Sequence, residues 1–234
     1  MPDLANALAF YVVFLFSTTL HEASHAWAAK LGGDPTAYHG GQVSLDPRPH
    51  IRREPFGMVV LPLISLLISG WPFGFASAPY DPQWAMRHPR RAAWMALAGP
   101  GANLALIGVS VLLIRVGVAV GGFQPPDSVV FSRIVAPDVA GGLWSGAAFM
   151  LSVFFSLNLV LFALNMLPLP PLDGSAAVPL LLSDEATARY QQFLWGQPAL
   201  SWIGILVAWQ VFDYVFQPVF LFAVNLVYPG VQYG

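Results

Sequence analysis

Two histidines four residues apart lie in an otherwise apolar segment near the N-terminus, and this feature constrains the fold most. They belong to the sequence His21-Glu22-Ala23-Ser24-His25. On an α-helix, residues four apart lie on one face, so both imidazoles can bind one metal ion. Glu22 lies about a quarter turn away, where its carboxylate can hold a water molecule without being a ligand itself. The spacing therefore predicts a metal site on a helix.

The apolar setting strengthens this prediction. Between Leu4 and Ala29, the only His, Asp, Glu, Lys or Arg side chains are His21, Glu22 and His25. A charged group at a bilayer centre costs roughly 2.5 to 3.5 kcal/mol, so three such groups need a partner. A purely structural polar cluster is the alternative, but it would not require the ligand spacing of zinc peptidases.

The composition is that of an integral membrane protein. Of the 234 residues, 56% are hydrophobic and only 9% are charged, whereas charged residues make up about a quarter of a typical globular domain. The net charge of −2 and the lack of a basic stripe exclude a nucleic-acid partner. The chain has no cysteine, so a metal would be held by histidine and carboxylate.

Three apolar segments, at about residues 4–30, 92–120 and 143–167, are long enough to cross a bilayer as helices. The N-terminus lacks the basic region of a signal peptide, so we expect the first segment to be retained. The last apolar region, about 198–228, crosses once or forms two helices broken near Pro218. We therefore expect an all-α polytopic membrane protein with a three-helix core plus a C-terminal transmembrane helix or helices.

The segment after the first helix is expected to differ. The apolar run 56–71 is short and contains Pro62, which favours a re-entrant segment over a spanning one. Val43 and Leu45 alternate with polar residues, as in a short strand. A re-entrant run would leave the flanking basic residues on one side of the membrane, which the positive-inside rule makes cytoplasmic. These residues are Lys30, Arg48, Arg52, Arg53, Arg87, Arg90 and Arg91.

Two further runs carry candidate functional residues. The small residues of 98–103 allow another backbone to approach closely, and Asn103 has either a packing or a catalytic role. After the third helix, prolines break the chain in the run from Asn165 to Gly174, which is tolerated at membrane depth where backbone is buried or lines a wet cavity. In this run, Asp173 is either a candidate third metal ligand or the N-cap of a following helix.

Taken together, three motifs resemble the site-2 protease family of intramembrane zinc metalloproteases. They are His21-Glu22-Ala23-Ser24-His25, the Ala98-Gly99-Pro100 to Asn103 run and the Asn165 to Gly174 run. The combination covers a core of about residues 5–175 and is more specific than the first motif alone. The chain is similar to the short bacterial branch without a PDZ domain.

This resemblance implies roles for individual residues. It implies that His21, His25 and Asp173 bind one Zn²⁺ per chain. It also implies that Glu22 is the general base and acid, and that Asn165 is a polar residue near the scissile bond. A membrane-associated β-hairpin and re-entrant region between residues 32 and 79 would lie beside the substrate.

The expected function is zinc-dependent endopeptidase activity on transmembrane segments, carried by a single membrane-embedded domain spanning residues 1–234. The expected partners are the lipid bilayer and single-pass or other membrane-protein substrates. The expected location is the cell membrane, with the active site nearer the cytoplasmic side. Alternatives are a zinc transporter or other intramembrane metal-binding protein, and an inactive relative that binds membrane proteins. A transporter should have repeated halves, and the sequence has none; it does not fix the oligomeric state.

Overall fold

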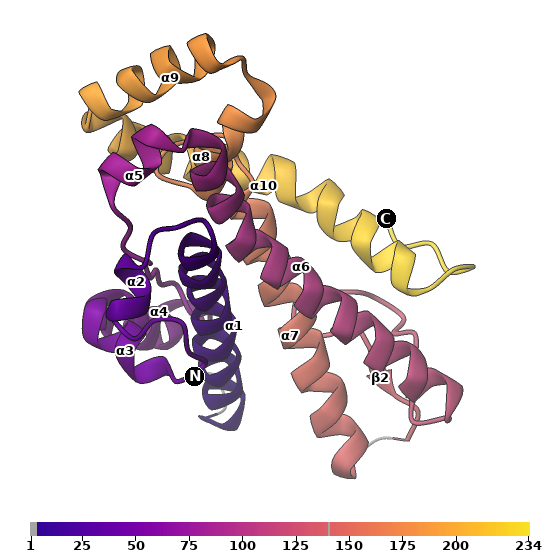
Figure 1. The fold of residues 1–234 in the computed structure, drawn as a ribbon. Coiled ribbons are helices and arrows are strands. Elements are labelled where there is room, and N and C mark those ends of the chain that lie inside the picture. Colours follow the sequence, from indigo (N-terminus) through magenta and orange to yellow (C-terminus); the bar gives the residue numbers. More distant parts are fainter. Residues whose placement is uncertain (1–3, 140) are drawn as a thin grey trace. The chain divides into compact units, whose positions relative to one another are not determined.

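The computed structural model describes residues 4–139 and 141–234, which are mostly helical (Figure 1). In these residues four helices are long and apolar enough to cross a membrane: α1 (Leu4–Leu31), α6 (Pro89–Ala119), α7 (Gly142–Asn165) and α10 (Ala199–Val227). The shortest, α7, has 24 residues and is about 36 Å long, which exceeds a hydrocarbon core of about 30 Å. The all-α polytopic fold class is confirmed.

The C-terminal apolar region forms one helix and not two. α10 runs without a break from Ala199 to Val227, with Pro218 in its interior. Proline is tolerated inside membrane helices because neighbouring groups satisfy the backbone that it frees. The side chain of Asp213 is exposed on this helix.

Shorter elements fill the connections between the long helices. They are α2 (Thr36–His39), α3 (Pro47–Arg53), the π-helix η1 (Phe56–Val60), α4 (Leu61–Ser69), α5 (Pro82–Arg87), α8 (Asp173–Ala177), the 3₁₀-helix η2 (Val178–Leu181) and α9 (Asp184–Gly196). Two strands, β1 (Phe123–Gln124) and β2 (Ala136–Pro137), pair antiparallel with Phe123 opposite Pro137.

The prediction of a β-hairpin after the first helix is wrong. Residues 32–79 are all described and contain no strand. The alternating residues 43–45 are followed at once by Asp46, which caps α3 by accepting a hydrogen bond from the Arg48 backbone N at 3.0 Å, with Pro47 at the start of the helix. Capping and proline therefore begin a helix where a strand would have to continue.

The predicted short apolar run forms a helical segment, Phe56–Ser69, made of η1 and α4. At 1.5 Å per residue it is about 21 Å long, too short to cross a bilayer. The π-helix η1 ends at Val60, two residues before Pro62. A proline ring clashes with the carbonyl four residues earlier in a regular α-helix, and a wider turn there relieves this clash.

After α4 the chain turns back along the same segment. The Phe73 backbone N donates a hydrogen bond to Ser65 Oγ at 2.7 Å, and the Phe75 backbone N donates to the Gly57 carbonyl at 3.1 Å. A Cβ on Gly57 would collide with the Phe75 carbonyl oxygen. Glycine at position 57 therefore permits this close return.

The contacts divide the chain into two compact units. The first runs from the N-terminus to Ala102 and includes Leu164–Val211, and the second comprises Asn103–Ala163 and Phe212–Gly234. In the first unit, α1 lies alongside α2, α3 and α4 (Figure 1). The single domain over residues 1–234 stays a prediction.

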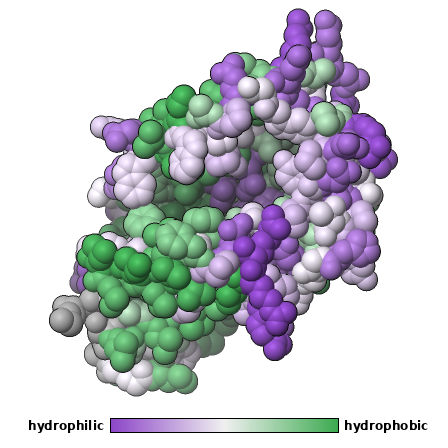
Figure 2. All heavy atoms as spheres, turned by 90° about the vertical axis from the view of Figure 1, so that its left-hand side faces the viewer, coloured by the Kyte–Doolittle hydropathy of each residue, from purple (hydrophilic) through white to green (hydrophobic). Residues whose placement is uncertain are grey.

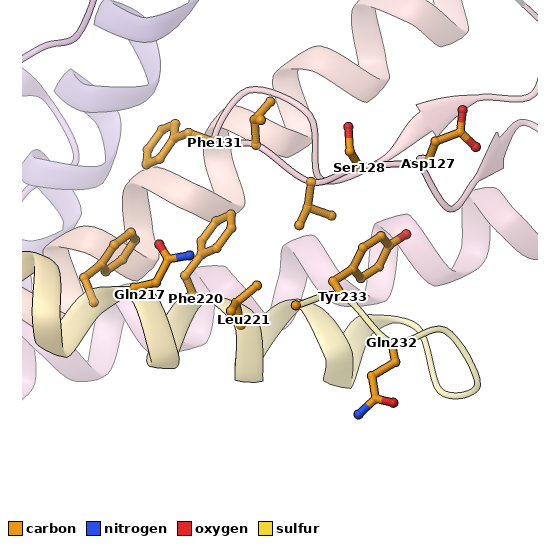
Figure 3. Close-up of a pocket in the computed structure, with 12 residues that line it drawn as sticks. Asp127, Ser128, Phe131, Gln217, Phe220, Leu221, Gln232 and Tyr233 are labelled. Atoms are coloured by element: carbon orange, nitrogen blue, oxygen red, sulfur yellow. The ribbon is translucent and has the colours of Figure 1, made fainter.

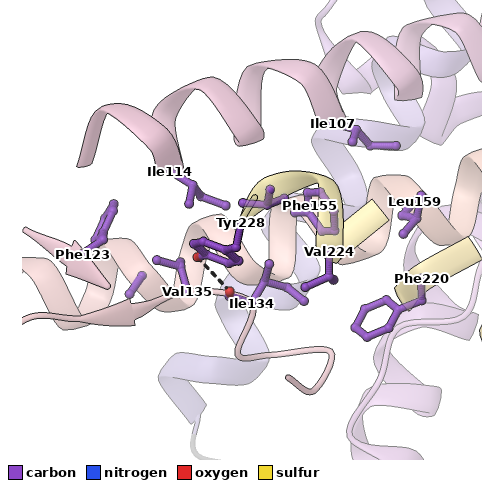
Figure 4. Packing of buried hydrophobic residues seen from close by; sticks show 12 residues of the cluster. Ile107, Ile114, Phe123, Ile134, Val135, Phe155, Leu159, Phe220, Val224 and Tyr228 are labelled. Carbon is purple, nitrogen blue, oxygen red and sulfur yellow. Dashed lines mark hydrogen bonds between the residues drawn. The ribbon is translucent and has the colours of Figure 1, made fainter. Parts of the chain in front are cut away.

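An apolar core holds the second unit together (Figure 4). The loop between α6 and α7 is tied to this core by hydrogen bonds. Ser152 Oγ accepts from the backbone N of Ile134 and of Val135, at 2.9 and 3.2 Å. The Tyr228 hydroxyl donates to the Ile134 carbonyl at 3.0 Å (Figure 4).

Asn103 forms a buried side-chain hydrogen bond within the second unit. Its Nδ2 donates to Asn158 Oδ1 at 2.9 Å, and both residues are 0% exposed. Asn158 Nδ2 in turn donates to the Phe154 carbonyl at 2.8 Å. This geometry favours the packing role for Asn103 over the catalytic one.

We therefore expect Asn103→Ala to destabilise the fold without affecting the metal. It should lower the free energy of unfolding by about 1 to 3 kcal/mol, because the buried Asn158 Oδ1 loses its hydrogen-bond donor. Unfolding in mixed detergent micelles measures this change. A double-mutant cycle with Asn158→Ala should give a coupling of roughly 0.6 to 2 kcal/mol, and additive effects would contradict the pairing.

Candidate metal centre

The histidine motif lies in the C-terminal part of α1 and is buried. His21 and His25 are each 5% exposed, and Glu22 is 6% exposed. The helix continues through Leu31 before Gly33 adopts a positive φ of 98° and ends it. Because the helix is unbroken here, both imidazoles lie on the same face, as the spacing predicts.

The structure brings Asp173 to these two histidines from 152 residues away in the sequence. Asp173 Oδ2 lies 3.1 Å from His21 Nε2 and 3.3 Å from His25 Nε2, and the two Nε2 atoms are 3.0 Å apart. In a tetrahedral zinc site with bonds of about 2.0–2.1 Å, ligand atoms are roughly 3.3 Å apart. The three atoms therefore have the separations that a tetrahedral metal site requires.

The other ring nitrogen of His25 fixes its tautomer. His25 Nδ1 lies 2.7 Å from the Met95 carbonyl oxygen. A carbonyl only accepts, so Nδ1 carries the proton and donates, and Nε2 of the neutral ring keeps its lone pair for a metal. A ligating histidine usually donates its second N–H in this way. Sequence reasoning missed Met95 because a backbone carbonyl leaves no side-chain signal.

Gly99 of α6 closes one side of the cluster. A Cβ at this position would collide with the Nε2 atoms of both His21 and His25. The small-residue run predicted close backbone approach, and the structure shows that the backbone packs against the imidazoles themselves. A larger residue at position 99 would occupy the space in which the two imidazole nitrogens lie.

The proline-containing turn after α7 determines the position of Asp173. Asp173 is the first residue of α8, and the cap position is Leu172, which makes no side-chain capping bond. Asp173 is therefore not the N-cap, which was the alternative left open by the sequence. Gly174 lies so close to the Met166 carbonyl that a Cβ would collide with it, so the chain folds tightly back at this point.

The charge of Asp173 also suits a metal ligand. Burial raises the pKa of this carboxyl, but the neighbouring His25 and His21 side chains lower the pKa more, to well below its usual range. The carboxylate is therefore ionised at neutral pH, as a ligand must be.

Glu22 and Asn165 complete the set of predicted site residues. Glu22 shares the buried part of α1 with the two histidines. Asn165 is the last residue of α7 and is partly buried. Their catalytic roles stay predictions.

His50, by contrast, belongs to a structural cluster. It is 1% exposed, and its Nε2 donates to the Ser44 carbonyl at 3.1 Å.

The concave surfaces of the two units have different compositions. On the face of the first unit that carries α2 to α5, Figure 2 shows a recess with hydrophilic residues at its floor and hydrophobic residues at part of its border. The second unit has a cavity of about 600 Å³ (Figure 3). It contains no histidine and only one carboxylate, Asp127, so it lacks the ligand set of a metal site.

Comparison with known proteins gives the family. The model for peptidase family M50 matches residues 9–201. The chain belongs to peptidase family M50. This range includes both histidines, Glu22 and Asp173, and the assignment confirms the resemblance to site-2 proteases.

Curated relatives agree with this assignment. A protein of Bacillus subtilis with the name "Putative zinc metalloprotease YwhC" is 30% identical over 182 residues, which are 77% of this chain and 72% of the relative. Rip2 of Mycobacterium tuberculosis, named as the same kind of enzyme, is 33% identical over 200 residues, 82% of this chain and 67% of the relative. No solved structure matches the chain. The protein is thus a multi-pass membrane protein of a metalloprotease family.

The packing of Gly99 generates a direct test of the site. We expect Gly99→Ala to reduce metal binding at least tenfold, because the added methyl group displaces the two imidazoles by more than a ligand shell tolerates. The matched control is Gly101→Ala, two residues on, where a Cβ meets nothing within 4 Å. Metal content after dialysis against a zinc buffer measures both, and equal zinc in the two variants would contradict the packing argument.

Proposed function

We propose that this protein is a zinc-dependent intramembrane endopeptidase that cuts transmembrane segments of membrane proteins. The observation that carries the proposal is the meeting of His21, His25 and Asp173 at ligand distances, with both histidines buried and the Asp173 side chain 21% exposed. A site with three protein ligands leaves one tetrahedral position for water or substrate, as in catalytic zinc sites.

The ligand set fits one Zn²⁺ per chain. Imidazole nitrogen and carboxylate oxygen are ordinary zinc ligands, and the chain has no cysteine that could add a thiolate. When bound, zinc supplies Lewis-acid chemistry, because it acidifies water and polarises a carbonyl. His21 and His25 would hold it from α1, and Asp173 would hold it from α8.

Glu22 is proposed to move the proton. It lies next to His21 on α1, is buried, and is placed off the axis of the two ligands by about a quarter turn. As general base it accepts a proton from the attacking water, and as general acid it passes this proton to the leaving amine. Asn165 is proposed to hydrogen-bond near the scissile bond.

The proposed substrates are single-pass or other membrane proteins. A helical substrate hides its carbonyls in hydrogen bonds, so the segment to be cut must unwind before water can attack. The apolar segment η1–α4 supports a site reached from the bilayer, because its Leu67 and Ile68 are 80% and 81% exposed. Such large exposed apolar side chains suit contact with lipid or with another membrane helix.

The distribution of basic residues supports a site nearer the cytoplasmic side of the cell membrane. If α6 and α7 both cross, the segment before α6 and the segment after α7 lie on the same side. These two segments, with the adjoining helix ends, contain Lys30, Arg48, Arg52, Arg53, Arg87, Arg90, Arg91 and Arg189. The positive-inside rule makes this side cytoplasmic.

We expect Glu22→Gln to keep zinc and to abolish cleavage. The amide preserves the shape of the side chain but cannot accept the proton, which should slow cleavage by at least 10²-fold. Cleavage of a membrane-spanning test protein, with and without a zinc chelator, measures the effect. The matched control is Glu185→Gln, an exposed residue of α9. Full activity of Glu22→Gln would remove Glu22 from the mechanism.

We expect Asp173→Ala to lose most of the bound zinc, because only the two imidazole ligands of the cluster remain. Asp184→Ala, at an exposed carboxylate of α9, is the control. Metal analysis of the purified variants decides the matter. If Asp173→Ala keeps its zinc, the third ligand lies elsewhere. Zinc flux into proteoliposomes without any cleavage would instead support a transporter.

A further inference from the structure

One stripe of α1 runs from the part of the helix that η1 and α4 cover to the metal site. Tyr11, Phe14, Thr18, His21 and His25 follow one another at spacings of three and four residues. Residues at these spacings lie one above the other on the same helix face. Thr18 therefore lies about one turn from His21 and two turns from His25, on their own face.

The N-terminal part of this stripe is covered by η1, α4 and the chain that returns from α4. The Tyr11 hydroxyl donates to the Met58 carbonyl at 3.2 Å. The Phe14 ring contacts Gly74 so closely that a Cβ there would collide with it. Phe14 is 2% exposed, so no space for a ligand is left at this level.

The C-terminal part of the stripe is covered by the metal site itself. Gly99 packs on the Nε2 atoms of His21 and His25, and the Asp173 carboxylate lies against the same two atoms. Both covers belong to the same compact unit as α1. Thr18 lies between them.

Thr18 carries a buried hydroxyl that neither cover satisfies. The residue is 5% exposed, and within the described part of the chain its Oγ1 has no hydrogen-bond partner. A helical threonine can bond to the carbonyl four residues before it, but this hydroxyl does not. Leaving a buried hydroxyl unpaired costs folding free energy. On the metal-site face, this hydroxyl is free to bond to a group that enters beside His21.

We propose that Thr18 binds the substrate: its hydroxyl donates a hydrogen bond to a main-chain carbonyl of the unwound segment as that segment passes the metal site. This inference rests on the proposed function. Unwinding a membrane helix exposes carbonyls that have no water to bond to in the hydrocarbon region. One hydrogen bond from Thr18 satisfies such a carbonyl and the orphaned hydroxyl together, without requiring a particular substrate sequence.

The neighbouring residue supplies a matched control. Thr19 is 2% exposed, and its Oγ1 is also unpartnered in the described part of the chain. Its side chain is rotated by about 100° around the helix axis, away from the metal-site stripe. Thr18→Val and Thr19→Val thus remove the same buried group from positions that differ in direction.

The test measures substrate binding separately from cleavage. In Glu22→Gln protein loaded with zinc, a fluorescently labelled single-pass peptide with a glycine-rich centre is titrated in lipid nanodiscs. We expect Thr18→Val to weaken binding about 2- to 12-fold, the range of one hydrogen bond. Thr18→Ser, which keeps the hydroxyl, and Thr19→Val should bind within about twofold of the parent. In Thr18→Val, the zinc content should be unchanged, and the Tm of the peptide-free protein should be unchanged or higher.

Three results would overturn the inference. Equal binding by Thr18→Val and its parent would mean that the hydroxyl does not contact substrate. A lower Tm with less zinc would make Thr18 structural. A peptide that no variant binds would also exclude the role. Failure of the proposed function is distinguishable: Glu22-containing protein would bind the peptide, with the Thr18 dependence intact, but would not cut it.

Discussion

The structure depends on one long-range contact, in which the partly exposed Asp173 carboxylate meets the buried His21 and His25 imidazoles. Each of these groups alone would be costly at membrane depth. Together they have the separations and donor types of a tetrahedral metal site. The remaining features of the first unit can be understood as means of holding this contact in place.

Backbone groups contribute as much to this centre as side chains do. The Met95 carbonyl sets the tautomer of His25, and the absence of a side chain at Gly99 leaves room for both imidazole nitrogens. Gly174 allows the tight fold at Asp173. Helix α6 thus shapes the site through its backbone, although it contributes no ligand. This explains how a chain with few polar side chains can build a precise polar site.

Much of the candidate site could be predicted because its signal is local. The spacing of His21 and His25 follows from helix geometry, and the proline-rich motif identified Asp173 by resemblance. Met95 and the partner of Asn103 could not be predicted, because a carbonyl has no sequence signature and a pairing with Asn158 depends on how two helices pack. The short strand was mispredicted because alternation at Val43 and Leu45 competes with the cap at Asp46, and the cap prevailed. The length of the run 56–71 and the distribution of basic residues favoured a re-entrant segment, and the helical segment Phe56–Ser69 is shorter than a spanning helix.

The most direct test of the account is X-ray absorption at the zinc edge of the purified, detergent-solubilised protein. We expect one zinc per chain in a four-coordinate shell of nitrogen and oxygen at about 2.0–2.1 Å, with the outer-shell scattering of two imidazoles and no sulfur. A protein that binds no zinc, or a shell without imidazole scattering, would contradict it.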